Sequence, residues 1–154
     1  VSLQGLLRRT MKKNLVFLDT NIFLRHILED DMHTAGCVEV MLGELFAKKS
    51  TQLLTSDVVY GEVFYTLTKF YRLQTPQVIE TVRALMAVDH LHTLHTADFG
   101  EALLFHETYG LKIGDCLIIS QLPEQALLCT LDKEFKKIPW VTTIAPQDVI
   151  GLDV

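Results

Sequence analysis

A short apolar run at positions 15–18, Leu-Val-Phe-Leu, ends abruptly at Asp19. An uninterrupted apolar run of this length is typical of a strand that is buried on both faces. Further strand-like runs occur at residues 52–55, 91–94, 126–131 and 141–144, and segments with helical periodicity separate them. Strands that alternate with helices predict an α/β domain with a mainly parallel sheet.

The 154 residues suit one domain, and 49% hydrophobic residues are enough for one core. No apolar run approaches the roughly 20 residues that a membrane helix needs. Three widely spaced cysteines without a CxxC pair favour reduced thiols and a cytoplasmic protein. The net charge of −5 disfavours broad electrostatic capture of nucleic acid but allows a local basic rim. We expect residues 1–13 to be a flexible extension and residues 14–154 to form the domain.

Four acidic residues occupy positions that need a reason. Asp19 and Asp132 each follow a predicted strand, at the edge of a parallel sheet where ligands bind. Glu62 interrupts the apolar stripe of a predicted helix over residues 57–71, and Asp115 begins a helix on its core-facing side. Taken singly, Asp19 and Asp132 are typical turn residues, Asp115 a typical N-cap, and Glu62 a possible partner of a buried cation.

Convergence of the four carboxylates favours a different interpretation. Two carboxylates about 4 Å apart repel by roughly 4 kcal/mol at an effective dielectric constant near 20. A hard divalent cation relieves that repulsion, and Mg²⁺ binds carboxylates together with water and substrate phosphates. Phosphodiester hydrolysis is the chemistry that follows from such a site.

Four segments, in this order, carry a resemblance to a known family: residues 15–25 (LVFLDTNIFLR), 61–63 (GEV), 114–118 (GDCLI) and 130–135 (TLDKEF). Together they closely resemble the PIN-domain ribonucleases, in particular the VapC-type toxins of toxin–antitoxin pairs. The resemblance covers about residues 14–148. Cys116 replaces a frequent Ala, Glu134 replaces a frequent Asp, and Trp140 stands where Gly is common, but no carboxylate of the pattern is lost.

The resemblance implies a single PIN-like domain with helices on both faces of the sheet. It also implies an acidic pocket that binds Mg²⁺ or Mn²⁺, endonucleolytic cleavage of RNA, a homodimer and a protein antitoxin. The acidic positions of the family's pattern fall on Asp19, Glu62, Asp115 and Asp132, as catalytic residues and metal ligands. Its supporting polar positions fall on Asn21 and Thr130.

Other features carry weaker predictions. Arg25, Lys133, Lys136 and Lys137 lie near the acids in sequence, and either contact RNA phosphates or form a solvated face. His90 and His92 share one strand face, but a polar edge strand explains them better than zinc does. A lone tryptophan such as Trp140 near a strand start more often packs in a core than at a pocket rim or partner surface.

The sequence therefore predicts a Mg²⁺- or Mn²⁺-dependent endoribonuclease that is the toxin of a toxin–antitoxin pair. Two alternatives stay open: a housekeeping PIN nuclease of RNA processing, and a non-catalytic RNA-binding module with the same fold. A metal-dependent phosphatase is more remote, because a haloacid-type site needs Asp-x-Asp and this chain has Asp19-Thr20-Asn21.

Overall fold

A computed structural model describes residues 14–29, 35–47, 51–149 and 152. Within these residues, five strands form one sheet in the order β3-β2-β1-β4-β5, and every neighbouring pair is parallel. The strands are β1 (Asn14–Leu18), β2 (Thr51–Ser56), β3 (Leu91–Leu94), β4 (Leu127–Cys129) and β5 (Thr142–Ile144). The expected flexible extension, residues 1–13, lies outside the described residues.

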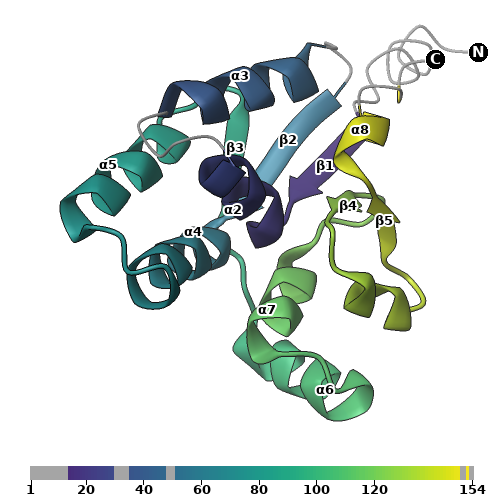
Figure 1. Cartoon of the computed structure of the whole chain (residues 1–154). Coiled ribbons are helices and arrows are strands. Elements are labelled where there is room, and N and C mark those ends of the chain that lie inside the picture. The colour runs from purple at the N-terminus through teal and green to yellow at the C-terminus, as the bar shows by residue number, and fades with distance from the viewer. Residues whose placement is uncertain (1–13, 30–34, 48–50, 150–151, 153–154) are drawn as a thin grey trace, which may run out of the picture.

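Helices fill the connections between the strands, as parallel pairing requires. They are α2 (Thr20–Glu29), α3 (Ala35–Phe46), α4 (Asp57–Tyr65), the π-helix η1 (Thr66–Phe70), α5 (Thr75–Met86), α6 (Phe99–Tyr109), α7 (Ile113–Gln121), the 3₁₀-helix η2 (Lys133–Lys137) and α8 (Pro146–Val149). Helices α2, α3, α4 and α5 gather on one side of the sheet, and α6 and α7 form a separate pair (Figure 1). The expected α/β fold with a parallel sheet flanked by helices is confirmed.

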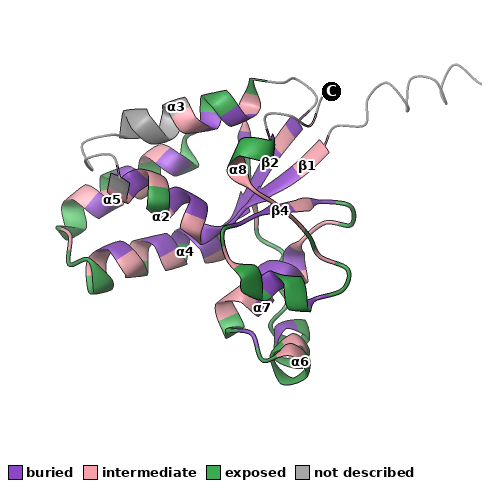
Figure 2. Ribbon diagram, turned by 45° about the vertical axis from the view of Figure 1, so that its right-hand side comes forward, coloured by how far each residue is buried: buried purple, intermediate pink, exposed green. Residues whose placement is uncertain are grey.

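The core is built around β1, the central strand. Val16, Phe17 and Leu18 have no exposed surface, which agrees with a strand covered on both faces. The strands form the buried centre of the molecule, and exposed residues concentrate on the outer faces of the helices (Figure 2). No described helix is long and apolar enough to cross a membrane.

Local signals place the helix ends close to where the sequence predicts them. Ser56 caps α4, because its Oγ accepts a hydrogen bond from the Val59 amide at 3.4 Å. Pro76 lies in the first turn of α5. Gly110 ends α6 in the left-handed conformation, with φ of 69°, which glycine adopts without a steric cost.

Two sequence-based expectations about the sheet and the core were wrong. The strand expected over residues 126–131 ends at Cys129: the Thr130 amide still binds the Ile144 carbonyl, but the Leu131 and Asp132 amides turn away to bind side chains. Trp140 is not in the core: it is 56% exposed and contacts two rings of α6. The ring centroids of Phe105 and Tyr109 lie 5.4 and 5.8 Å from that of Trp140.

Candidate active site

Asp19 lies directly after β1, at the carboxyl end of the sheet's central strand. The chain leaves β1 toward β2 on one side, and returns later to place β4 on the other side. Ligands of parallel sheets bind at such a switch point, outside the carboxyl ends of the strands. The Asp19 residue is only 3% exposed, so its carboxylate needs polar partners.

Three hydrogen bonds hold the Asp19 carboxylate. Its Oδ1 accepts from the Thr20 amide at 2.7 Å, and its Oδ2 accepts from Thr130 Oγ1 at 2.7 Å and Asn21 Nδ2 at 3.0 Å. The expected supporting roles of Asn21 and Thr130 thus have a geometric basis. Both oxygens of Asp19 are fixed in direction before any ligand arrives.

The loop after β4 is tied to the same cluster. Asn21 Oδ1 accepts from the Leu131 amide at 3.1 Å, and Thr130 Oγ1 accepts from the Asp132 amide at 3.0 Å. These bonds replace strand pairing and shorten β4 relative to expectation. Asp132 then caps η2, since its Oδ1 accepts from the Glu134 amide at 2.9 Å. Asp132 is therefore a turn residue, as considered from the sequence, and also lies near Asp19.

Glu62 reaches the site from α4, and Asp115 reaches it from α7. The two helices meet closely: a Cβ on Gly114 would lie 3.1 Å from Glu62 Oε1. A larger residue at position 114 would therefore require the Glu62 carboxylate to shift. Among the described residues, Glu62 Oε1 is buried and has no hydrogen-bond partner, although the Thr20 side chain and the Lys112 charge both lower the pKa of the Glu62 carboxyl.

Helix α7 begins two residues earlier than the sequence suggests, at Ile113. Lys112 is its N-cap residue, and Asp115 is the third residue of the helix, with no capping hydrogen bond from Lys112. Asp115 is therefore not an N-cap. The capping explanation for its position is wrong, and its half-buried carboxylate calls for another one.

Burial raises the pKa of all three inward-facing acids. For Glu62 the pKa rises to about 7, first through burial and then through the charges of Asp115 and Asp19. For Asp115 it rises to about 6, again through burial first, and then through Asp19 and Asp132. Burial also raises the pKa of Asp19, although its hydrogen bonds oppose the change. Asp19 and Asp115 are thus within electrostatic reach of each other, and each is within reach of Asp132, while Glu62 is within reach of Asp19 and Asp115.

Two further charged residues act on the site: Lys112, which sequence reasoning missed, and Glu134, which it named only as a departure from the family's pattern. The Lys112 ammonium lowers the pKa of both Glu62 and Asp115, so it lies within reach of both carboxylates. Glu134 adds a fifth negative charge that raises the pKa of Asp115. The place of Lys112, three residues before Asp115, was visible in the sequence, but its importance depended on where α7 begins.

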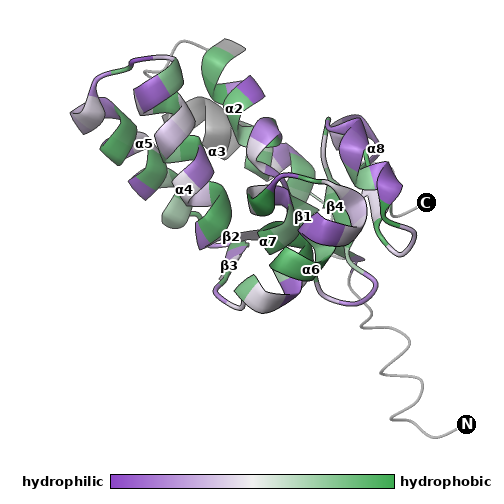
Figure 3. Ribbon diagram, turned by 90° about the horizontal axis from the view of Figure 1, so that it is seen from below, coloured by the Kyte–Doolittle hydropathy of each residue, from purple (hydrophilic) through white to green (hydrophobic). Residues whose placement is uncertain are grey.

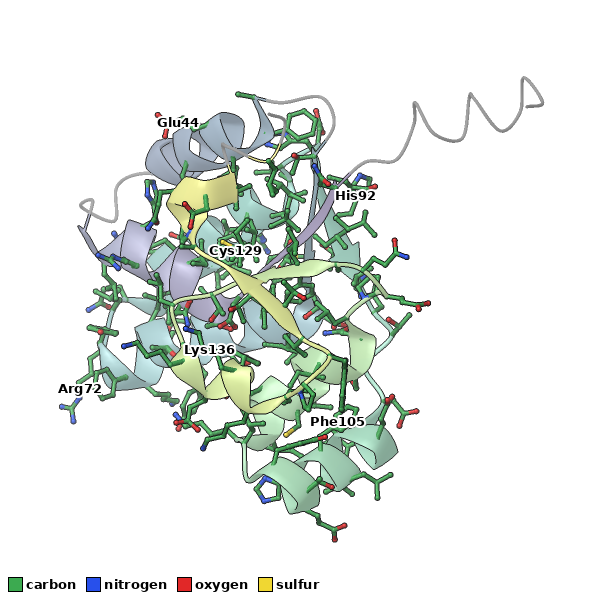
Figure 4. All side chains as sticks on the ribbon, turned by 90° about the vertical axis from the view of Figure 1, so that its right-hand side faces the viewer. Glu44, Arg72, His92, Phe105, Cys129 and Lys136 are labelled. Atoms are coloured by element: carbon green, nitrogen blue, oxygen red, sulfur yellow. The ribbon has the colours of Figure 1, made fainter. Side chains whose placement is uncertain are left out.

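The predicted basic residues lie on two elements beside the acids. Arg25 is on α2, and Lys133, Lys136 and Lys137 are on η2. The three lysines are exposed, and Lys137 Nζ forms an ion pair with Glu134 Oε2. Lys136 can be followed on η2 in Figure 4, on the side of the molecule that carries β4 and β5.

His90 and His92 lie in different surroundings. His92 is exposed on the edge strand β3, whereas the His90 ring stacks on Phe46 with centroids 4.2 Å apart. In the described ranges, no three His, Cys, Asp or Glu side chains are arranged as a ready-made metal cluster. Mg²⁺ does not require one, because it is commonly held by one or two carboxylates and keeps several waters.

Comparisons with known proteins agree with this architecture. The family model of the PIN domain matches residues 16–141. No curated protein sequence matches the chain. Among solved structures, VapBC2 from Rickettsia felis, bound to a DNA fragment from its promoter, is similar, with 24% identity over 85% of this chain and 98% of that chain and a TM-score of 0.58.

Two further solved structures are similar. VapBC-1 from nontypeable Haemophilus influenzae is 19% identical over 86% of this chain and 98% of that chain, with a TM-score of 0.61. A toxin–antitoxin complex from Klebsiella pneumoniae is 21% identical over 85% of this chain and 97% of that chain, with a TM-score of 0.51. At these identities the likeness concerns the fold.

Proposed function

The chain belongs to the PIN domain family, and from this premise we propose that it is a Mg²⁺- or Mn²⁺-dependent endoribonuclease, the toxin of a toxin–antitoxin pair. The observation that carries the proposal is the cluster of Asp19, Glu62 and Asp115. Three acids with raised pKa values lie together near the switch point of a parallel sheet. Their mutual repulsion does not stabilise the fold, but it favours the binding of a cation.

The residues fit a hard divalent cation. Every donor is a carboxylate oxygen, and Glu62 Oε1 is buried without a hydrogen-bond partner among the described residues. We propose that Asp19, Glu62 and Asp115 hold the cation directly or through water, and that Asp132 orders the attacking water or holds a second cation. A bound cation supplies Lewis acidity, which lowers the pKa of a water and offsets charge that develops on the phosphate.

The chain's own residues orient the reaction. In hydrolysis, water forms a new P–O bond, one P–O bond to ribose breaks, and the departing oxygen gains a proton. Thr130 and Asn21 keep Asp19 Oδ2 in one direction, so the site does not have to reorganise as charge develops. Lys112 is placed to balance part of the carboxylate charge or to attract the substrate's phosphate.

An antitoxin partner and a homodimer are parts of the same proposal. The similar solved structures are VapBC or toxin–antitoxin complexes, which supports a protein partner. Exposed apolar side chains gather on two surfaces, one over α4 and η1 (Tyr65, Phe70, Tyr71) and one over α6 (Phe99, Leu103, Leu104). The hydrophobic residues of α6 are visible in Figure 3. Light scattering at micromolar concentration tests the dimer, and a monomer contradicts it.

The deciding experiment pairs two measurements on the wild type and on Asp115→Asn. Cleavage of a mixed RNA pool is followed with Mn²⁺ or with EDTA, and thermal unfolding is followed in the same buffers. We expect metal-dependent cleavage by the wild type, and a rise in its melting temperature with Mn²⁺, because a ligand of the native state stabilises it. Both responses should be much smaller in the variant.

The same measurements separate the alternatives. A wild type that neither cleaves nor responds to metal, but still binds RNA, is a non-catalytic RNA-binding module. A metal-dependent nuclease that co-purifies with no antitoxin, and whose expression does not arrest growth, is a housekeeping enzyme.

A further inference from the structure

A pocket of about 400 Å³ lies beside the acids, between the loop after β4, η2 and the segment that follows β5. Its lining includes Thr130 and Asp132 from the acidic cluster, and Lys133 and Lys136 from η2. The volume is within the range of small-ligand sites, roughly 300–1,000 Å³. Of the four proposed catalytic acids, Asp132 alone is in this lining, so the proposed function leaves the rest of the pocket unexplained.

The pocket is connected to the proposed reaction centre by direct bonds. Thr130 Oγ1 donates to Asp19 Oδ2 and accepts from the Asp132 amide, so one residue of the pocket lining also binds Asp19. A single strand with one phosphate at Asp19 can therefore extend past Thr130 toward this pocket. This connection favours a substrate that extends from the acids into the pocket over a separate small ligand.

The charges of the pocket suit a nucleotide. Lys133 and Lys136 bring two cations to the edge of a strongly acidic site, in a chain whose net charge is −5. Such cations are where a phosphate next to the scissile one is held. Lys137, on the same short helix, does not line the pocket and pairs with Glu134 instead.

Other lining residues offer acceptors and an apolar surface. Asp148 and Thr143 contribute a carboxylate and a hydroxyl to the lining. A carboxylate repels phosphate but accepts hydrogen bonds from the exocyclic amine of a base. Leu131, 39% exposed, forms part of the rim, where an unstacked base can pack against it. Recognition of splayed bases by their edges is typical of single-stranded RNA.

We propose that this pocket is a nucleotide subsite: it binds the residue of single-stranded RNA next to the scissile phosphate, with Lys133 and Lys136 on the backbone and Asp148 at the base. The inference rests on the proposed function, since it assigns the substrate's neighbouring nucleotide to the same site. It adds a prediction of specificity, because Asp148 favours A, C or G, which carry an exocyclic amine, over U.

The first test measures RNA binding apart from cleavage. In an Asp115→Asn background with Mg²⁺, fluorescence anisotropy gives the affinity for a labelled single-stranded RNA of mixed sequence at several salt concentrations. Lys133→Ala and Lys136→Ala should each weaken binding at least about fivefold. Each should also make the slope of log affinity against log salt shallower by about 0.7, as loss of one phosphate contact to a single strand requires.

Matched variants keep the test specific. Lys69→Ala removes an exposed lysine from η1, outside the pocket, and should change neither affinity nor slope. Lys137→Ala should have a smaller effect than Lys136→Ala, because Lys137 lies outside the lining and is paired. Equal effects of all four variants would reduce the result to general charge attraction and overturn the subsite.

The second test concerns the base. Asp148→Asn should reduce the preference for RNAs with an amine-bearing base over U at the subsite by about fivefold or more. Competition between decamers that differ at one position measures this ratio. Unchanged ratios would remove Asp148 from base recognition and contradict the assigned specificity.

Failure of the subsite and failure of the proposed function give different results. If the wild type cleaves RNA with Mn²⁺ while the pocket variants bind RNA as it does, the nuclease stands and the subsite is wrong. If the wild type neither cleaves nor binds RNA, both are wrong. If the lysine variants keep their RNA affinity but lose a co-purifying protein, the pocket is a protein contact and not a nucleotide subsite.

Discussion

Two parts of the acidic cluster are built in opposite ways. Asp19, at the end of β1, accepts three hydrogen bonds that hold both of its oxygens. Glu62 and Asp115 come from α4 and α7, and at Glu62 the Oε1 atom is buried without a partner among the described residues. Burial raises the pKa of all three carboxyls, but only at Asp19 do three hydrogen bonds oppose the change, whereas the pKa of Glu62 rises to about 7 and that of Asp115 to about 6.

The difference shows what each part contributes. Hydrogen bonds to the charged form fix direction and reduce the cost of burying the anion. Burial without enough hydrogen-bond donors makes the charged form of a carboxyl costly, and a bound cation offsets that cost. Asp19, at the end of β1, therefore offers a ligand two oxygens of fixed direction. Glu62 and Asp115, on the helices, supply the unfavourable charge that a bound cation relieves.

The largest expected effect treats both parts alike. Asp19→Asn and Asp115→Asn should each lower the rate of RNA cleavage at least about 100-fold, because each removes a charge from the cation site while keeping the side chain's shape. Single-turnover cleavage in Mn²⁺ measures the rate. Asp89→Asn, an exposed change before β3, is the control and should retain full activity. Loss of activity in only one of the two variants would contradict a cation that Asp19 and Asp115 both hold.

The same two variants should move stability in opposite directions. In the wild type the Asp19 carboxylate accepts three hydrogen bonds. Asp19→Asn replaces one of its oxygens by an NH₂ group that cannot accept them, and should lower the free energy of unfolding by about 1–3 kcal/mol. Asp115→Asn relieves repulsion and should raise the melting temperature of the metal-free protein by a few degrees. Thermal unfolding in EDTA measures both, and shifts of the same sign would contradict the comparison.

The metal-free protein should lose stability as pH rises from about 4.5 to 7. The pKa of Glu62 is about 7 in the native state against an ordinary 4.5, so between these values the folded chain holds a proton that the unfolded chain has released. Stability falls with rising pH wherever the native state binds more protons. Glu62→Gln should flatten this part of the profile of melting temperature against pH. A wild-type profile that rises through this range would be contrary to the expected sign.

The smallest expected effect concerns the contact between the two helices. Gly114→Ala should weaken the stabilisation by Mn²⁺, because its Cβ would lie 3.1 Å from Glu62 Oε1 and displace the carboxylate. Gly43→Ala in α3 is the control, since nothing lies within 4 Å of its added Cβ, and it should stabilise the helix by up to about 1 kcal/mol. Equal Mn²⁺ responses in the two variants would show that the Glu62 position is not constrained by Gly114.

The sheet-borne part of the cluster was the more predictable from sequence. An apolar run that stops at Asp19 predicts both the buried strand and the position of Asp19 at its carboxyl end. The helix-borne part was predictable as residues but not as an environment. Whether Glu62 is paired or orphaned depends on how closely α7 approaches α4, which Gly114 permits and which no local pattern encodes.

Errors occurred where side chains took over from regular backbone pairing. The apolar run over residues 126–131 continues past the true end of β4, because Asn21 and Thr130, distant in sequence, bind the Leu131 and Asp132 amides. Trp140 was expected in a core from its residue type and its place near a strand start, yet it lies on the surface against α6. Both outcomes were decided by tertiary contacts.

The exposed position of Trp140 has an experimental consequence. It is the single tryptophan of the chain, so the fluorescence of the unlabelled protein under selective excitation comes from one known place. Its ring lies among Phe105 and Tyr109 beside the apolar surface of α6. A molecule that covers this surface would remove water from the indole and shift its emission to shorter wavelength. The protein thus carries a built-in optical probe for whatever docks at α6.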